Sequence, residues 1–509
     1  MEATYQKEQG GALTCECHGE HHLPDYAGDM KKILSSSARI LPAGKFIGGE
    51  EVQFGGAVCY DVWYLDSENH LTHEAFSTDY EFTFPRGNGT VDGIASVSVA
   101  HYTLRPSGPR RISAKAMLKA EACLRETATY SCESSVESAT LHTLEKTVEV
   151  GHRIFSEPME RECGEEMPLP AMYARDAEIA FSEGSVHIDS VVAEENGVLV
   201  RGNYAVSVVL TADGLVPLRH AESYPLEEHI PLEGCVEDMA AMANGFFSSL
   251  TFNVRETEGE EPMLTFHGIL ELSASAEKNL PISVVADAFA EGGGTVCEND
   301  LLMYDVFGPA ETLCRTVELC MPISEDAGDL DGVFYTTVSL KNEACTVSER
   351  EINYTADAEI HALCYTLDEA GMPHYSAEKQ TVPFVLTLPL RAPLAEDARL
   401  SLEAHPGMCE GRLDENKICV ECRMVLSIRS ASVRKESCVR RITVEQRECG
   451  VFVPTYAVYY PTPTDSLWTI AKRYGVSPAS IAACNHLTSE VSSVEERLPD
   501  MLMIDQRRA

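Results

Sequence analysis

Residues 464–476 read Thr-Asp-Ser-Leu-Trp-Thr-Ile-Ala-Lys-Arg-Tyr-Gly-Val and contain a complete helix signal. Four apolar residues follow the i, i+3, i+4, i+7 spacing of one helical face: Leu467, Ile470, Ala471 and Tyr474. Three oxygen-bearing side chains precede them, where the free backbone amides of a first helical turn need acceptors: Thr464, Asp465 and Ser466. Gly475 supplies the left-handed residue that ends many helices. The stretch therefore predicts a short amphipathic helix that ends at Tyr474.

The flanking sequence predicts a second helix and two short strands around the first. Ser477-Pro478 repeats the start signal, a cap followed by proline at the first helical position, and residues 479–484 can form a helix that stops at Asn485. Residues 456–460 and 501–504 are short apolar runs typical of strands. Together these segments predict a small α+β unit with the order strand, helix, helix, strand.

This βααβ unit resembles a LysM domain. Ten of its positions fit the family pattern: Asp465, Ser466, Leu467, Trp468, Ile470, Ala471, Tyr474, Gly475, Val476 and Asn485. It departs from the pattern at Thr464, which stands in place of the family's entry glycine, and at residues 498–500, where Leu-Pro-Asp replaces the usual glycine turn. In LysM domains these two loops frame a groove for glycans, so the resemblance implies a ligand surface there.

The resemblance also indicates which residues of the unit contact a ligand, a glycan or a protein partner. The candidates lie in the loops at the helix ends: Pro463, Thr464, Asp465, Ser466 and Asn485. Lys472 and Arg473 are two cations in an acidic protein and form a second candidate surface, on the outer face of the first helix. The alternative is that both are ordinary solvated helix positions. Leu467, Ile470 and Tyr474 are assigned to the small core.

The composition disfavours several classes of partner. The chain has 509 residues and a formal charge of −40, which repels phosphate backbones and anionic lipid surfaces. We therefore expect no nucleic-acid partner, and no apolar run approaches the ~20 residues needed to span a bilayer. Residues 1–10 carry neither a basic nor an apolar signal segment, so the sequence predicts a cytoplasmic protein whose 18 cysteines stay reduced.

Two groups of cysteine and histidine have spacings that suggest metal ligands. Cys419 and Cys422 lie three apart in an alternating run, and residues three apart in a strand point to opposite faces, which argues against a shared metal. The second group combines thiols and imidazoles within eight residues: Cys15, Cys17, His18, His21 and His22. The interpretation that we favour is a flexible leader over residues 1–29 that carries incidental ligands, and we predict no metal or other cofactor.

The rest of the chain repeats one pattern three times. Each copy has a strand pair that ends at a proline, over residues 56–85, 202–231 and 358–389. The prolines are spaced by roughly 150 residues, about the length of one domain. A long alternating strand follows each of them, and period-two alternation with Asp, Asn and Gly at the bends is typical of antiparallel sheet. The sequence therefore predicts a mainly β protein of three tandem antiparallel β-sandwich-like modules, followed by the LysM domain.

The predicted boundaries place the three modules at residues 30–150, 151–300 and 301–446 and the LysM domain at 447–509. Residues 126–168 and 290–324 are interpreted as linkers, although 148–155 and 315–322 alternate enough to add strands. Residues 236–248 are predicted as the one helix before the LysM domain.

Three such modules followed by one LysM domain resemble the SipL-like proteins of spore-forming bacteria, whose repeated module is called the SPOCS domain. The first copy carries the module's motifs best: Ile33-Leu34, Glu51 to Gly56, Tyr64-Leu65-Asp66 and Phe82 to Pro85. The resemblance implies a coat-assembly adaptor in the mother-cell cytoplasm, at the forespore surface. It also implies that the LysM domain docks a SpoIVA-like coat ATPase, and that the modules contact other coat proteins or copies of the same chain.

The sequence contains none of the common catalytic motifs. The phosphate loop of ATPases, the His-Glu-x-x-His of metalloproteases and the Gly-x-Ser-x-Gly of hydrolases do not occur. We therefore expect a non-enzymatic scaffold. The alternative is a protein that binds the N-acetylglucosamine-containing glycan of peptidoglycan through its LysM domain, and a wall hydrolase comes third.

Overall fold

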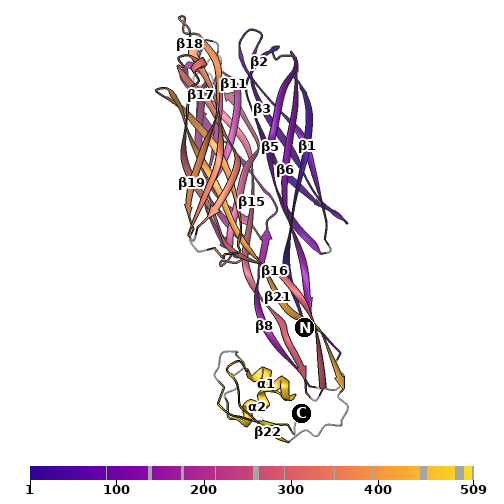
Figure 1. Ribbon diagram of the computed structural model, residues 1–509. Coiled ribbons are helices and arrows are strands. Elements are labelled where there is room, and N and C mark those ends of the chain that lie inside the picture. Colours follow the sequence, from indigo (N-terminus) through magenta and orange to yellow (C-terminus); the bar gives the residue numbers. More distant parts are fainter. Residues whose placement is uncertain are drawn as a thin grey trace.

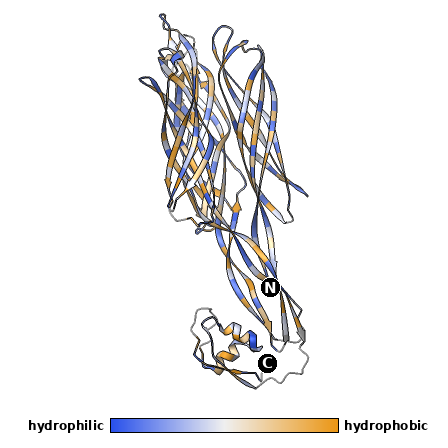
Figure 2. Ribbon diagram, viewed as in Figure 1, coloured by the Kyte–Doolittle hydropathy of each residue, from blue (hydrophilic) through white to orange (hydrophobic). Residues whose placement is uncertain are grey.

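Three β-modules and one small helical unit make up the computed structural model (Figure 1). It describes residues 1–87, 89–135, 140–173, 177–212, 214–255, 263–291, 293–348, 350–390, 394–446, 455–487 and 498–506. The chain is mainly β, as the sequence predicts, and apolar and polar residues alternate along its strands (Figure 2). Because alternate residues of a strand face opposite sides, each strand can bury one face and expose the other.

Module 1 comprises β1 to β6 and packs two three-stranded antiparallel sheets face to face. One sheet has the order β2-β3-β4, and the other has the order β1-β6-β5. The strands are β1 (Glu2–His22), β2 (Met30–Ile47), β3 (Glu51–Asp66), β4 (Leu71–Pro85), β5 (Thr90–Gly108) and β6 (Arg111–Ser131). Aromatic residues of β3 and β4, such as Phe54 and Phe82, meet small residues of β6, such as Ala116 and Ala120, in the core.

Module 2 comprises β8 to β15 and repeats this arrangement with a broken first strand. The sheet β11-β12-β13 packs on β15, which pairs with β14 on one side and with β8, β9 and β10 in succession on the other. The elements are β8 (Leu141–Phe155), β9 (Met159–Cys163), β10 (Glu166–Pro168), η1 (Ala171–Tyr173), β11 (Glu178–Glu194), β12 (Gly197–Thr211), β13 (Leu218–Pro231), β14 (Ala240–Arg255) and β15 (Met263–Ala290).

Module 3 comprises β16 to β21, with the sheets β17-β18-β19 and β16-β21-β20. Its elements are β16 (Gly293–Pro322), η2 (Glu325–Ala327), β17 (Gly332–Val347), β18 (Glu351–Leu367), β19 (Pro373–Pro389), β20 (Arg399–Asp414) and β21 (Lys417–Gln446). The short strand β7 (Glu133–Ser135), which follows module 1, pairs in parallel with the end of β21. Modules 1 and 3 are therefore joined by backbone hydrogen bonds as well as by packing.

The repeat begins earlier in each copy than the sequence predicts. Residues 1–29 are not a flexible leader, because β1 pairs with β6 along its whole length, from Glu2 to His22. The boundary predicted at 150/151 falls inside β8, and the boundary predicted at 300/301 falls inside β16. The two segments predicted as linkers, residues 126–168 and 290–324, contain the first strands of modules 2 and 3. The predicted helix at 236–248 is also wrong: β14 occupies most of it, since Met242 and Ala243 are held in a sheet against β15.

Equivalent positions of the three modules meet in one aromatic cluster, which we call the head junction. Its buried members are Trp63, Phe181, Val209, Phe334, Tyr335 and Leu363. In each module a β-bulge interrupts the same strand pairing, at Leu34, Ala180 and Phe334. A bulge changes the direction of the side chains beside it. Because of these three bulges, side chains of β2, β11 and β17 are directed toward a common centre. The modules are therefore packed around a shared core.

Below the head junction, the long strands continue as three two-stranded ribbons that we call the stalk: residues 1–9 with 124–132, 141–153 with 277–290, and 293–307 with 431–446 (Figure 1). The ribbons share a second core, which includes Tyr130, Val150, Val284 and Val439. The Tyr130 hydroxyl donates to the Val439 carbonyl and accepts from the Val285 amide, so it links all three ribbons inside that core.

The LysM unit has the predicted βααβ order and lies near the end of the stalk (Figure 1). Its elements are β22 (Tyr456–Tyr459), α1 (Leu467–Tyr474), α2 (Pro478–Cys484) and β23 (Leu502–Asp505). Leu467, Ile470 and Ala471 of α1 are buried, which confirms the predicted helical face. Among the described residues, no helix has the length and apolar character that crossing a membrane requires.

Candidate functional site

The loop before α1 is organised by Asp465. Its Oδ2 accepts from the Tyr459 hydroxyl, the Thr462 amide and the Thr462 hydroxyl, each at 2.8 Å. These hydrogen bonds lower the pKa of the Asp465 carboxyl, and the bond from the Thr462 amide contributes most to this lowering. Pro463 and Thr464 are exposed at the loop tip, and the Thr464 hydroxyl lies 3.1 Å from that of Thr462. Asp465 therefore holds the loop in shape, and Pro463 and Thr464 remain available to a ligand.

Ser466 is the N-cap of α1. The Thr469 amide donates to Ser466 Oγ at 3.1 Å, and the Ser466 amide donates to Thr469 Oγ1 at 2.9 Å, which completes a capping box. At the other end Gly475 has φ 66° and donates its amide to the Ala471 carbonyl. Both predicted ends of the helix are confirmed, and the Ser466 hydroxyl is engaged in the cap.

Asn485 connects α2 to β23. Its Nδ2 donates to the carbonyls of Ile481 at 2.8 Å and Met503 at 2.7 Å, and its Oδ1 accepts from the Met503 amide at 2.7 Å. The side chain thus bonds to Met503 in both directions, as a neighbouring strand would. The structure gives Asn485 this structural role. Residues 488–497, which precede the predicted groove loop at 498–500, lie outside the described residues.

Lys472 binds a carboxylate of the stalk instead of standing free on the outer helix face. Its Nζ donates to Asp287 Oδ1 at 2.5 Å, and Trp468 Nε1 donates to Asp287 Oδ2 at 2.9 Å. The indole also packs edge-on against Phe289, with ring centroids 4.9 Å apart. We call this set of four residues the LysM mount. Arg473 turns the other way and donates to the Tyr459 hydroxyl at 2.9 Å.

The charge state of Asp287 follows from this geometry. Burial alone would raise the pKa of its carboxyl, but the hydrogen bonds from Lys472 and Trp468 outweigh burial and lower the pKa.

A bulge between Val285 and Asp287 interrupts the pairing of β15 with β8 beside this contact. Sequence analysis missed Asp287 and Phe289, because one acid among 80 and one aromatic in a strand carry no local signal.

The outer face of the LysM sheet carries exposed apolar side chains. Val458 and Met503 are directly opposite each other on β22 and β23 and are 56% and 46% exposed. Tyr456, Tyr460 and Met501 are also exposed large side chains along these two segments. The helices cover the opposite face, where Leu502 and Ile504 are buried.

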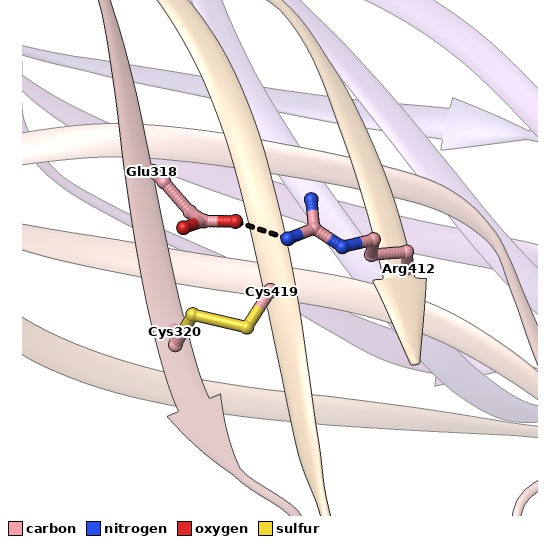
Figure 3. The surroundings of a disulfide bond; sticks show 4 residues. All are labelled: Glu318, Cys320, Arg412 and Cys419. Atoms are coloured by element: carbon pink, nitrogen blue, oxygen red, sulfur yellow. Dashed lines mark hydrogen bonds and ion pairs between the residues drawn. A yellow bond between two sulfur atoms is a disulfide. The ribbon is translucent and has the colours of Figure 1, made fainter. Parts of the chain in front are cut away.

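A disulfide joins Cys320 and Cys419, which are directly opposite each other on β16 and β21 (Figure 3). The expectation that all cysteines stay reduced is therefore corrected. Cys422 points into the core of module 3, on the opposite face from Cys419, as residues three apart in a strand should. Glu318 lies beside the disulfide and forms an ion pair with Arg412. Glu318, Cys320 and Cys419 are the one metal-like group among the described residues, but their two sulfurs bond to each other.

The cysteines and histidines of β1 are directed to different partners. Cys15 and Cys17 lie on one face, with their sulfurs 3.9 Å apart. His18 is beside Glu16, whereas His21 is 3.3 Å from Glu74 and stacks on Phe76. His22 lies at the last paired position of the strand. The strand thus separates ligands that are close together in the sequence.

Comparison with known families finds a LysM domain at residues 462–491, a segment that contains α1, α2 and the loop before α1. Searches of curated proteins and of solved structures found no match to the chain.

Proposed function

We propose that the protein is a non-enzymatic adaptor whose LysM unit is its principal binding module. The observation that carries this proposal is the LysM mount, in which Asp287 and Phe289 hold one side of α1 while the loop tip at Pro463 and Thr464 stays exposed. A binding unit fixed in this way presents its loop in a defined direction from the stalk. The parts of the three β-modules outside the stalk, which we call the head, offer surfaces on which other proteins can assemble.

The resemblance to SipL-like proteins supports a specific setting for this adaptor. It would work in the mother-cell cytoplasm at the surface of the forespore, and its LysM unit would dock a SpoIVA-like coat ATPase. Self-association and contacts with other coat proteins would involve the modules. The exposed apolar face around Val458 and Met503 supports a protein partner, because protein interfaces bury such side chains.

A second candidate function is binding of N-acetylglucosamine-containing glycan. The match at residues 462–491 favours it, since LysM domains commonly bind glycans. Thr464, which stands in place of the family's entry glycine, would contact such a glycan directly, because its side chain lies at the exposed tip of the loop. No nucleic acid is proposed as a partner, given the charge of −40.

Two assays of the full-length chain test these functions against each other. Capture from a lysate of sporulating cells should retain a SpoIVA-like ATPase, identified by mass spectrometry, and sedimentation with purified peptidoglycan should leave the chain in solution. The variant Thr464→Arg should block capture, because it places a bulky cation at the loop tip. Thr346→Arg, at an exposed position of β17, is the matched control. Sedimentation with the sacculi, lost in Thr464→Arg, would establish glycan binding instead.

A further inference from the structure

A cleft lies between modules 1 and 3, to one side of the head junction. Two adjoining cavities of about 370 Å³ and 180 Å³ share the wall residues Ser36 and Lys379. Strands β2 and β5 form one wall, and β17, β18 and β19 form the other. The larger cavity is within the size range of small-molecule sites, which are typically about 300–1,000 Å³.

The polar groups of this cleft converge on one buried carboxylate. Lys341 Nζ is 2.9 Å from Glu359 Oε2, and Lys379 Nζ is 3.1 Å from Glu359 Oε1. His361 Nε2 also lies 3.1 Å from Oε1, and its Nδ1 lies 3.2 Å from Ser35 Oγ. Both carboxylate oxygens are therefore bonded, and the Glu359 side chain is only 10% exposed.

The two lysines have donors left over. An ammonium group carries three N–H donors, and Glu359 accepts one from each lysine. The lysine side chains are 39% and 54% exposed, so the remaining donors can reach a ligand in the cavity. In the lining of the larger cavity, two ammonium groups face one carboxylate and leave a net positive charge, whereas the whole chain has a charge of −40. The carboxylate of Glu378, which lines the smaller cavity, accepts hydrogen bonds from the amide and hydroxyl of Ser324. The other residues with polar side chains in the lining of the larger cavity are Ser36, His101, Tyr102, Thr103 and Ser339.

We propose that this cleft binds a small organic anion with a double negative charge, a dicarboxylate or a phosphate monoester. Lys341 and Lys379 would each donate to an anionic oxygen, and the hydroxyl groups would bond to the remaining oxygens. Because the walls belong to different modules, the bound anion would also link module 1 to module 3. The proposal does not depend on what the LysM unit binds.

Isothermal titration calorimetry of the full-length chain with succinate, and separately with inorganic phosphate, tests the proposal at constant ionic strength. We expect saturable binding at one site for at least one of the two anions, and the anion that binds identifies the acidic group. The variants Lys341→Met and Lys379→Met should each weaken binding at least tenfold, and the double variant should abolish it.

The control variant is Lys119→Met. Lys119 is a comparable lysine, 51% exposed and paired with Glu121, but it lies outside the cleft. It should bind like the unmodified chain, whereas Glu359→Gln should bind the anion more tightly because the competing negative charge is removed. Absence of binding by the unmodified chain, or equal losses in Lys119→Met and Lys379→Met, would overturn the proposal. Circular dichroism of each variant verifies that it is folded.

Discussion

The chain has two tryptophans, and they lie at two junctions with different chemistry. Trp63 is 2% exposed at the head junction, in contact with Phe181, Phe334 and Tyr335, and its Nε1 has no hydrogen-bond partner among the described residues. Trp468 is half-buried at the LysM mount and bonds to Asp287. The first junction is held by apolar burial from three modules. The second depends on one carboxylate and one ring contact, so it should open much more readily.

The largest effect is expected from Trp63→Ala. Removing a buried tryptophan leaves a cavity shared by all three modules, and such truncations cost about 3–5 kcal/mol of unfolding free energy. Urea unfolding followed by circular dichroism should show an early transition for the whole head. Trp63→Phe, which keeps an aromatic ring, should retain most of the stability. An unchanged transition in Trp63→Ala would mean that the modules unfold independently of the head junction.

A second large effect is expected where the stalk meets the head, at Arg153. Its Nε donates to Glu277 and its Nη1 donates to Glu8, both at 2.6 Å, and its guanidinium lies 4.5 Å from the centre of the Phe307 ring. Arg153→Met should cost about 3 kcal/mol, because Glu277 would keep a buried charge without its partner. The double variant Arg153→Met/Glu277→Leu should recover much of that loss. If it does not, packing of the arginine rather than its charge is what matters.

A smaller and local effect is expected from Asp287→Asn at the LysM mount. The variant replaces a charge-assisted bond to Lys472, and bonds of that kind contribute about 1.5–3 kcal/mol. In a Trp63→Phe background Trp468 is the one remaining tryptophan, so its fluorescence should report a more solvated indole. The urea transition of the head should not move. The control is Asp238→Asn, which removes a carboxylate paired with Lys278 elsewhere in the molecule.

The effect expected at the cleft between modules 1 and 3 is absent at neutral pH and confined to acid. Burial alone would raise the pKa of Glu359, but hydrogen bonds from Lys341, His361 and Lys379 lower it to about 2. The folded-state pKa is below the ordinary value of about 4.3, so the carboxylate stabilises the fold above that value. This stabilisation should be lost as the pH falls from about 4.3 to about 2. Urea midpoints measured over this range should fall less in Glu359→Gln than in the unmodified chain.

The LysM unit could be predicted from sequence because its signals are local. Ser466 and Gly475 mark the two ends of α1, and Leu467 and Ile470 mark its buried face. None of these signals depends on distant parts of the chain. The alternating strands of the modules were predictable for the same reason. The roles of Asp465 and Asn485 are only partly local, since Asn485 bonds to Met503 on the far side of a loop.

The start of each module could not be found in the same way. β1 contains Gly10-Gly11 and several charged residues, so its strand character depends on pairing with β6, more than 80 residues later in the chain. At residues 236–248, the predicted helix was outweighed by the pairing of β14 with β15 and by the burial of Ala243 in the core of module 2. The disulfide depends likewise on the register that sets Cys320 opposite Cys419.

The bulges at Leu34, Ala180 and Phe334 have a consequence for how many modules such a chain can hold. Each of the three modules touches the other two, and each contributes the same two strands to the central cluster. In a solenoid every repeat contacts only its neighbours, and further repeats can be stacked on the end. Here the array closes on itself, so a fourth copy would find no vacant place at the centre, and the copy number is limited by geometry to three.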